Sequence, residues 1–122
     1  MADEITASAS IGYEDSEGAD ELLAVSEKLA TVASKKYIKA KQNIGTSEEA
    51  ITLGEVTSPG WGVFINRDAT NFINLKVATG GAIFAKLLPG EFACLRLGSG
   101  AQAPFAIADT GACQMEYFIA QT

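Results

Sequence analysis

The feature of this chain that most constrains its fold is the regular punctuation of its second half, where short runs of alternating apolar and polar residues are separated by turn residues. Alternation with a period of two places successive side chains on opposite faces of a strand. Strands that follow one another at intervals of about 10 residues are typical of sandwiches and barrels. We therefore predict an all-β fold, a β-sandwich or a jelly-roll-like barrel built from a C-terminal antiparallel meander with an N-terminal strand or arm. The predicted strands cover residues 50–53, 61–66, 72–78, 82–88, 91–97, 105–108 and 113–120.

Turn residues mark the ends of these runs. Gly supplies left-handed backbone geometry, and Pro, Asn and Asp favour reversals of the chain. In the loop 66–71, the Asn and Asp side chains are expected to bond the neighbouring backbone and fix the loop, in preference to a calcium site, which takes more carboxylates. The predicted turns lie at residues 59–60, 66–71, 79–81, 89–90, 98–100 and 109–111.

The alternation also predicts which side chains form the core. Phe118 lies on the outer side of the last run and indicates that this outer face is partly covered. The inward positions are expected to be Ile73, Leu75 and Val77 in one strand and Cys113, Met115, Tyr117 and Ile119 in the last strand.

The two cysteines and the single tryptophan each allow two interpretations. Cys94 and Cys113 lie in strand-like runs, so buried, reduced thiols are favoured over a bridge between neighbouring strands. Trp61 is favoured as a core anchor because burial of aromatic side chains dominates the energetics of a domain. An exposed Trp61 would instead be a platform for a sugar.

The chain of 122 residues fits a single domain, which commonly holds about 100 to 150 residues. Residues 1–44 are predicted as a strand or arm region and residues 45–122 as the core. Ile5, Ala7, Ala9 and Ile11 alternate with polar residues and predict a half-buried strand. Residues 13–18 are predicted as a loop, and residues 20–34 as mostly extended, with a short helix as the alternative.

Charge is segregated along the N-terminal region. Residues 1–27 hold eight acidic and no basic side chains, whereas residues 28–41 hold five lysines and no acid. A period of two places Lys35, Tyr37, Lys39 and Lys41 on one side of a predicted strand. Protection of a sheet edge is the favoured explanation, because charged side chains discourage unwanted strand pairing. The alternative is a docking stripe for an acidic neighbour, such as the acidic segment of another copy.

The composition removes several classes of function. The chain contains no histidine, the commonest general base and metal ligand near neutral pH. The adjacent carboxylates Glu14-Asp15 and Glu48-Glu49 are expected to be loop charges rather than glycosidase acids. We therefore predict no catalytic, metal or cofactor site and no enzymatic activity.

The charge and the apolar runs also limit the expected partners. A net charge of −6 opposes binding to nucleic acid, because that affinity comes largely from Lys and Arg. No apolar run approaches the roughly 18 residues needed to span a bilayer, and the acidic start is unlike a signal peptide. We expect neither nucleic acid nor membrane as a partner, and synthesis in a cytoplasm.

Several segments between residues 45 and 122 carry a resemblance to a known group of proteins. They are Gly45-Thr46-Ser47-Glu48-Glu49, Leu53-Gly54-Glu55-Val56, Gly60-Trp61-Gly62-Val63-Phe64-Ile65-Asn66-Arg67-Asp68-Ala69-Thr70-Asn71, Leu88-Pro89-Gly90-Glu91 and Ala106-Ile107-Ala108-Asp109-Thr110. In these segments the chain resembles small structural proteins of tailed bacteriophages. The resemblance implies a small β-sandwich that serves as a virion component, for instance a capsid decoration or cement protein arranged in trimers.

We therefore expect a non-enzymatic bacteriophage virion protein, a capsid decoration or cement protein that stabilises the head by binding between capsid subunits as a symmetric oligomer, a homotrimer. Its partners would be the major capsid protein and other copies of itself, and it would be located on the capsid surface. The alternatives are a carbohydrate-binding or adhesion module and a tail or collar component. The expected partner-contact residues are Ile5, Ala7, Ala9, Ile11, Lys35, Tyr37, Lys39 and Lys41.

Overall fold

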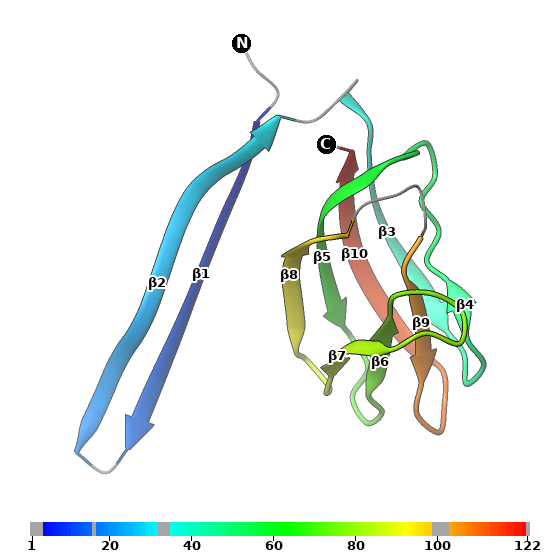
Figure 1. Ribbon diagram of the computed structural model, residues 1–122. Helices are drawn as coiled ribbons and strands as arrows, with labels where there is room; N and C mark the ends of the chain where they lie inside the picture. The colour runs from blue at the N-terminus through cyan, green and yellow to red at the C-terminus, as the bar shows by residue number, and fades with distance from the viewer. Residues whose placement is uncertain (1–3, 16, 32–34, 99–102, 122) are drawn as a thin grey trace.

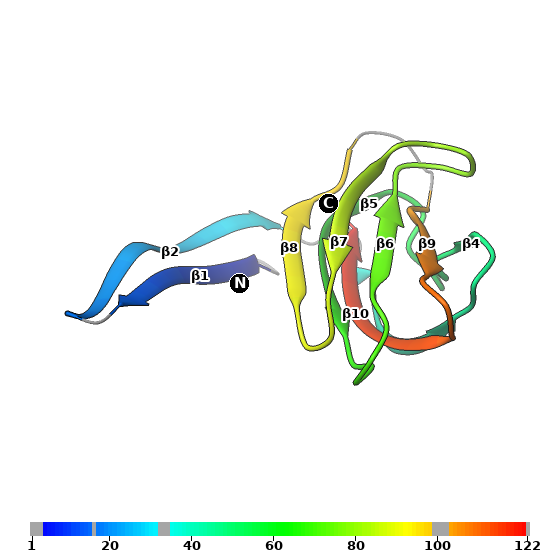
Figure 2. The ribbon, with the colours of Figure 1, turned by 90° about the horizontal axis from the view of Figure 1, so that it is seen from below.

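The computed structural model describes residues 4–15, 17–31, 35–98 and 103–121, and the regular elements in these ranges are ten strands. Two long strands form a separate hairpin, and eight shorter strands form two antiparallel four-stranded sheets that pack face to face (Figures 1 and 2). The predicted all-β sandwich is therefore confirmed.

The first sheet, here called the β3–β8 sheet, has the spatial order β3-β10-β5-β8. The second sheet has the order β4-β9-β6-β7. The strands of the first sheet are β3 (Tyr37–Ile44), β10 (Cys113–Gln121), β5 (Pro59–Asn66) and β8 (Phe92–Arg96). Those of the second sheet are β4 (Glu49–Ala50), β9 (Phe105–Ala108), β6 (Ile73–Lys76) and β7 (Ile83–Leu87).

The connectivity of the sandwich is that of a jelly roll, one of the two predicted architectures, but the prediction that its strands follow one another as a meander is wrong. In a meander, strands that are neighbours in sequence pair with each other. Here only β6 and β7 do so among the described strands of the sandwich, and most connections cross from one sheet to the other. Alternation identifies the buried face of a strand but carries no information about its pairing partner.

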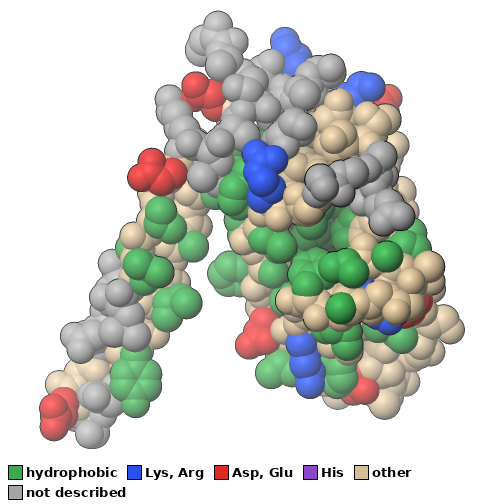
Figure 3. All heavy atoms as spheres, viewed as in Figure 1, with side chains coloured by type: hydrophobic (Ala, Val, Ile, Leu, Met, Phe, Trp, Pro, Cys, Tyr) green, Lys and Arg blue, Asp and Glu red, His purple; other side chains and the backbone are tan. Residues whose placement is uncertain are grey.

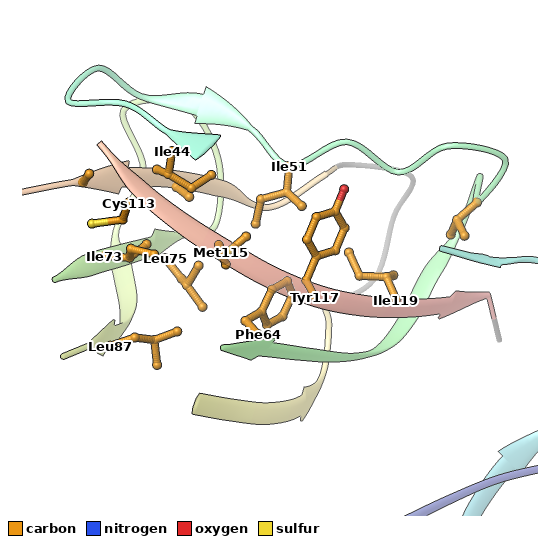
Figure 4. Packing of buried hydrophobic residues seen from close by; sticks show 13 residues of the cluster. Ile44, Ile51, Phe64, Ile73, Leu75, Leu87, Cys113, Met115, Tyr117 and Ile119 are labelled. Carbon is orange, nitrogen blue, oxygen red and sulfur yellow. The ribbon is translucent and has the colours of Figure 1, made fainter. Parts of the chain in front are cut away.

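The core lies between the two sheets and follows the predicted alternation (Figure 4). The inward side chains of β10 are completely or almost completely buried, as are Ile73 and Leu75 of β6. Val77 is an exception, because β6 ends at Lys76 and leaves the Val77 side chain exposed. The buried Tyr117 donates a hydrogen bond from its phenol to the Thr52 carbonyl at 2.7 Å, and burial raises the pKa of that phenol.

The strand boundaries correct several details of the prediction. Pro59 and Gly60 belong to β5 rather than to a turn. The predicted strand 50–53 is reduced to the two residues of β4, and the Ile51 amide donates to the Pro104 carbonyl beyond it. β3 is an edge strand of the sandwich, so the core begins near residue 37 instead of residue 45. Of the predicted turn 98–100, residues 99 and 100 lie outside the described residues.

The turn between β7 and β8 shows how local sequence produces a connection between the sheets. The Glu91 amide donates to the Leu88 carbonyl at 2.9 Å, and Gly90 has a φ of 82°. Pro at the second position and a residue with positive φ at the third define a type II turn, which explains Pro89-Gly90. The turn residues were therefore correctly predicted, although the turn joins different sheets.

The loop 66–71 is fixed by its own side chains, as predicted. Asn66 is completely buried and donates from Nδ2 to the carbonyls of Asn71 and Leu87 at 2.9 and 3.0 Å. Its Oδ1 accepts from the Asp68 amide at 2.9 Å. The Asp68 carboxylate in turn accepts from the amides of Asn71 and Thr70, and these bonds hold the pKa of Asp68 below its ordinary value.

This arrangement predicts a pH-dependent effect of the substitution Asp68→Asn. A carboxyl whose folded pKa is lowered stabilises the protein above its unfolded pKa, near 3.8, and loses that contribution as the pH falls through the folded pKa. The variant is expected to melt at a lower temperature than the wild type at about pH 7, with a difference that shrinks toward about pH 3. Calorimetry at both pH values checks this, and Asp109→Asn in a neighbouring turn controls for net charge. A constant difference would contradict it.

Candidate interaction surface

The N-terminal hairpin consists of β1 (Glu4–Asp15) and β2 (Gly18–Thr31). It replaces the predicted loop at 13–18 by continuous strands that reverse near residue 17, and it confirms the mostly extended conformation of residues 20–31. Residues 32–34 lie outside the described residues. The hairpin extends away from the sandwich as an arm in both ribbon views (Figures 1 and 2).

The arm has one apolar and one polar face. Residues that lie directly opposite in an antiparallel pair share a face, and the register pairs Ala9 with Val25 and Ile11 with Leu23. Ser8, Ser10 and their neighbours occupy the other face. The arm's apolar face, defined here by its described apolar side chains, comprises Ile5, Ala7, Ala9, Ile11, Tyr13, Leu23 and Val25, and the register places Glu27 on the same face opposite Ala7, near the base.

Most of the arm's apolar face is uncovered. Ile5 and Ala7, near the base, are half-buried. Beyond them, the exposed fraction is 64% for Ile11 and 67% for Leu23. The predicted half-buried strand is therefore correct only at its base. Figure 3 shows hydrophobic side chains along the side of the arm that faces the sandwich.

A second apolar surface lies on the outer face of the β3–β8 sheet. In β5, Phe64 and Asn66 point into the core, so Trp61, Val63 and Ile65 point outward. Val63 pairs with Phe118 of β10 and with Cys94 of β8, and Ile65 pairs with Phe92. This outer apolar strip comprises Trp61, Val63, Ile65, Phe92, Cys94 and Phe118.

The arm and the outer apolar strip enclose a wedge-shaped gap. Near the base of the arm lies a cleft of about 260 Å³. Its walls include Ile5 and Ala7 of the arm and the sheet residues Trp61, Val63, Phe92, Cys94 and Phe118. Farther out, the gap widens to an opening of about 540 Å³ between Phe92 and the arm. The two apolar surfaces therefore face each other and lie closest at the base of the arm (Figure 3), and serines such as Ser10 line the wide opening beside Ala9 and Val25.

Trp61 lies in this cleft and not in the core, so the expected core anchor is wrong. The Arg96 guanidinium lies 5.8 Å from the centre of the Trp61 ring. The indole Nε1 of Trp61 is buried without an acceptor among the described residues. The sequence does contain a signal for this position. Trp61, Val63 and Ile65 are apolar on one face of the strand, and Phe64 is apolar on the other face. A strand with two apolar faces is covered on both sides.

The lysines of β3 lie on the same outer face, at the edge of the sheet opposite β8. Lys39 pairs with Phe118 and Lys41 pairs with Glu116, while Tyr37 packs against Phe118 with ring centres 5.7 Å apart. Lys35 is exposed just before the strand and has a φ of 56°. The position of β3 at the edge of the sheet agrees with the predicted edge protection.

A salt bridge sets the charge at this border. Arg67 contacts the Glu116 carboxylate at 2.8 Å, and this interaction, helped by the charges of Lys41 and Lys39, lowers the pKa of Glu116. Three cations thus surround one carboxylate, which leaves this side of the outer face positively charged.

The cysteines differ in their environments. Both thiols are free. Cys113 is completely buried, and burial raises its pKa, whereas Cys94 is exposed on the outer apolar strip. The prediction of a buried, reduced thiol is thus confirmed for Cys113 and wrong for Cys94, which faces away from the core.

The paired carboxylates at 48–49 have structural partners. Glu48 forms an ion pair with Lys76 and accepts from the Gly80 amide. Glu49 accepts from the Gly45 amide and from Gln42. Within the described ranges, no cluster of side chains suited to a metal ion is present.

The predicted contact residues therefore occupy two borders of one surface. Ile5, Ala7, Ala9 and Ile11 line the arm, and Tyr37, Lys39 and Lys41 line the opposite edge of the sheet. The outer apolar strip lies between these borders and was not predicted as a contact region. Comparisons with protein-family models, with curated proteins and with solved structures give no match to this chain. Among the described residues, no helix is long and apolar enough to cross a membrane.

Proposed function

We propose that the protein is a non-enzymatic virion component of a bacteriophage, a capsid decoration or cement protein that binds between subunits of the major capsid protein as a symmetric oligomer, a trimer. The observation that carries the proposal is the arm, which extends from a compact jelly-roll body and bears an apolar face that is largely exposed. Jelly rolls occur in viral capsid proteins and in lectins. An arm that reaches beyond the body is suited to joining neighbouring subunits.

The uncovered arm supports an assembly role for an energetic reason. An isolated two-stranded hairpin is marginally stable in water, because it lacks a second layer on its apolar face. Side chains such as Ile11 and Leu23 gain about 1.5 to 3 kcal/mol each on complete burial. Binding to a neighbouring surface would therefore stabilise both the arm and the assembly.

The surroundings of Trp61 favour this role over a sugar-binding module. Stacking on a sugar needs an accessible aromatic face with polar groups beside it. Trp61 is half-buried in a cleft whose other walls include Ile5, Val63 and Phe118, and its Nε1 is buried. These are the features of an interface between protein surfaces.

The location of the protein in the phage particle tests the proposal. Mass spectrometry of purified particles is expected to detect the chain in many copies, and immunogold labelling is expected to decorate the heads. Labelling confined to tails or collars would replace the capsid role by the tail or collar alternative. Absence of the chain from purified particles would overturn the virion role.

The arm predicts a further result with heads that lack the protein. Addition of the full chain is expected to raise the temperature at which these heads release their DNA. Ile11→Asp places a charge on the arm's apolar face and is expected to weaken binding at least about tenfold, a cost of about 1.4 kcal/mol. Ser10→Asp adds the same charge on the polar face and is the matched control. Equal binding by the two variants would exclude the apolar face as the contact.

A further inference from the structure

The arm is longer than the surface that its own chain offers it. β1 has 12 residues and spans about 40 Å at about 3.3 Å per residue. β5, in the middle of the facing sheet, has 8 residues and spans about 26 Å. The tip of the arm, where Asp15 pairs with Gly18, lies well away from the sandwich in both ribbon views (Figures 1 and 2). A surface outside this chain is therefore needed to cover the tip.

The outer apolar strip also lacks a complete cover. Phe92 is 65% exposed, and Cys94 beside it is exposed. The opening of about 540 Å³ next to Phe92 leaves room for a further layer. One chain thus carries two incompletely covered apolar surfaces, one on the two strands of the arm and one on the neighbouring strands β5, β8 and β10.

The charges around these surfaces are complementary. The arm contributes exposed Glu14, Glu17 and Glu27, and the whole segment 1–27 is acidic. Lys39, Lys41 and Arg67 border the outer apolar strip. Opposite charges at the rim of an interface steer association and fix its register. The surface that best matches the arm in both polarity and charge is therefore the β3–β8 sheet of another copy.

We infer that the arm of one protomer packs its apolar face on the outer apolar strip of a second protomer. Its distal residues enter the open side of the gap next to Phe92, from which the narrower cleft continues to Cys94, and its acidic tip lies toward the lysines of β3. The inference deepens the self-association in the proposed function. It also assigns the strip between the two borders as the seat of the arm.

Cys94 provides a direct test, because it lies in the proposed seat and the only other cysteine is buried. Ile11→Cys places a thiol on the exposed part of the arm's apolar face. Ile11 lines neither opening between the arm and its own sheet, so the two thiols are expected to meet between protomers. Oxidation of the full-length variant with oxidised glutathione is expected to give disulfide-linked oligomers on a non-reducing gel. If the protomers form a closed ring, the largest linked species on the gel contains as many subunits as the ring.

Two variants and the wild type serve as controls. Glu14→Cys places the thiol on the polar face of the same strand, and Glu14 lines neither opening. It is expected to form at least about tenfold fewer links, because successive side chains of a strand point to opposite faces and this one points away from the seat. The double variant Ile11→Cys, Cys94→Ser is expected to stay unlinked. The wild type can form no disulfide-linked species larger than a dimer joined through Cys94. Circular dichroism confirms that each variant retains the sheet structure.

The remaining outcomes would overturn the inference. A monomeric product with an internal disulfide would mean that the arm closes on its own sheet. Unlinked protein would mean that another class of molecule covers the arm, and links in the double variant would mean that arms pair with arms. If the variant forms linked oligomers but the protein is absent from phage particles, the inference stands and the proposed function is wrong. If the protein is present in phage particles but the variant forms no links, the proposed function stands and the inference is wrong.

Discussion

Replacement of Phe64 by alanine is expected to lower the free energy of unfolding by about 3 to 5 kcal/mol. Phe64 is completely buried at the centre of the β3–β8 sheet, where β5 pairs with both β10 and β8 (Figure 4). The cost combines the lost burial of the ring with the cavity that remains after partial relaxation. Because a domain of this size is stabilised by about 5 to 15 kcal/mol, the loss is a large part of the total. Urea unfolding followed by circular dichroism measures it.

Phe118→Ala is the matched control, because it removes the same ring from the opposite face of the same sheet. Phe118 is half-buried and contacts Tyr37. We expect a loss of about 1 kcal/mol in the isolated protein. Equal losses for the two variants would contradict the assignment of an inner and an outer face. The same control is expected to weaken self-association, because Phe118 belongs to the outer apolar strip.

Replacement of Asn66 by leucine is expected to cost about 3 kcal/mol, the second largest effect. Asn66 is completely buried, and its side chain makes three hydrogen bonds to the backbone at Asn71, Leu87 and Asp68. Leucine has a similar volume but leaves these backbone groups without their partner, at about 1 to 3 kcal/mol for each group that stays buried. Urea unfolding again measures the loss.

Asn66→Asp separates the lost hydrogen bonds from a change of volume. The introduced carboxyl has the same shape but faces two carbonyl oxygens, so only its protonated form can donate a hydrogen bond there. Its folded pKa is therefore raised, and the stability that it retains is present at low pH and lost as the pH rises through that pKa. The deficit relative to the wild type is expected to be larger at about pH 8 than at about pH 4. A deficit independent of pH would contradict the hydrogen-bonding role of Asn66.

Elements that depend on neighbouring residues were predictable. The alternation of Cys113, Met115, Tyr117 and Ile119 identified the buried face of β10, because a strand has the same period whatever it packs against. The loop 66–71 was predictable because Asn and Asp side chains bond nearby backbone. Half of the candidate surface was also predictable, since the apolar face of residues 5–11 is visible as a pattern.

The outer apolar strip was not predictable in the same way. Its members come from β5, β8 and β10, and they meet only because Val63 pairs with both Phe118 and Cys94. Trp61 shows the difficulty within a single strand, because apolar residues occur on both faces of β5. Sequence alone does not say which face meets the second sheet.

The sequence by itself determined that the chain forms strands, where most of them turn and which side chains share a face, because these properties depend on residues one to six positions apart. It also fixed the segregation of the acidic arm from the lysine-rich strand. Only the tertiary structure decided that β3 pairs with β10, so that Tyr37 lies opposite Ala120. Such pairing depends on contacts between segments that are far apart in the sequence. The same tertiary arrangement places the arm opposite the outer apolar strip, and neither surface is completely covered.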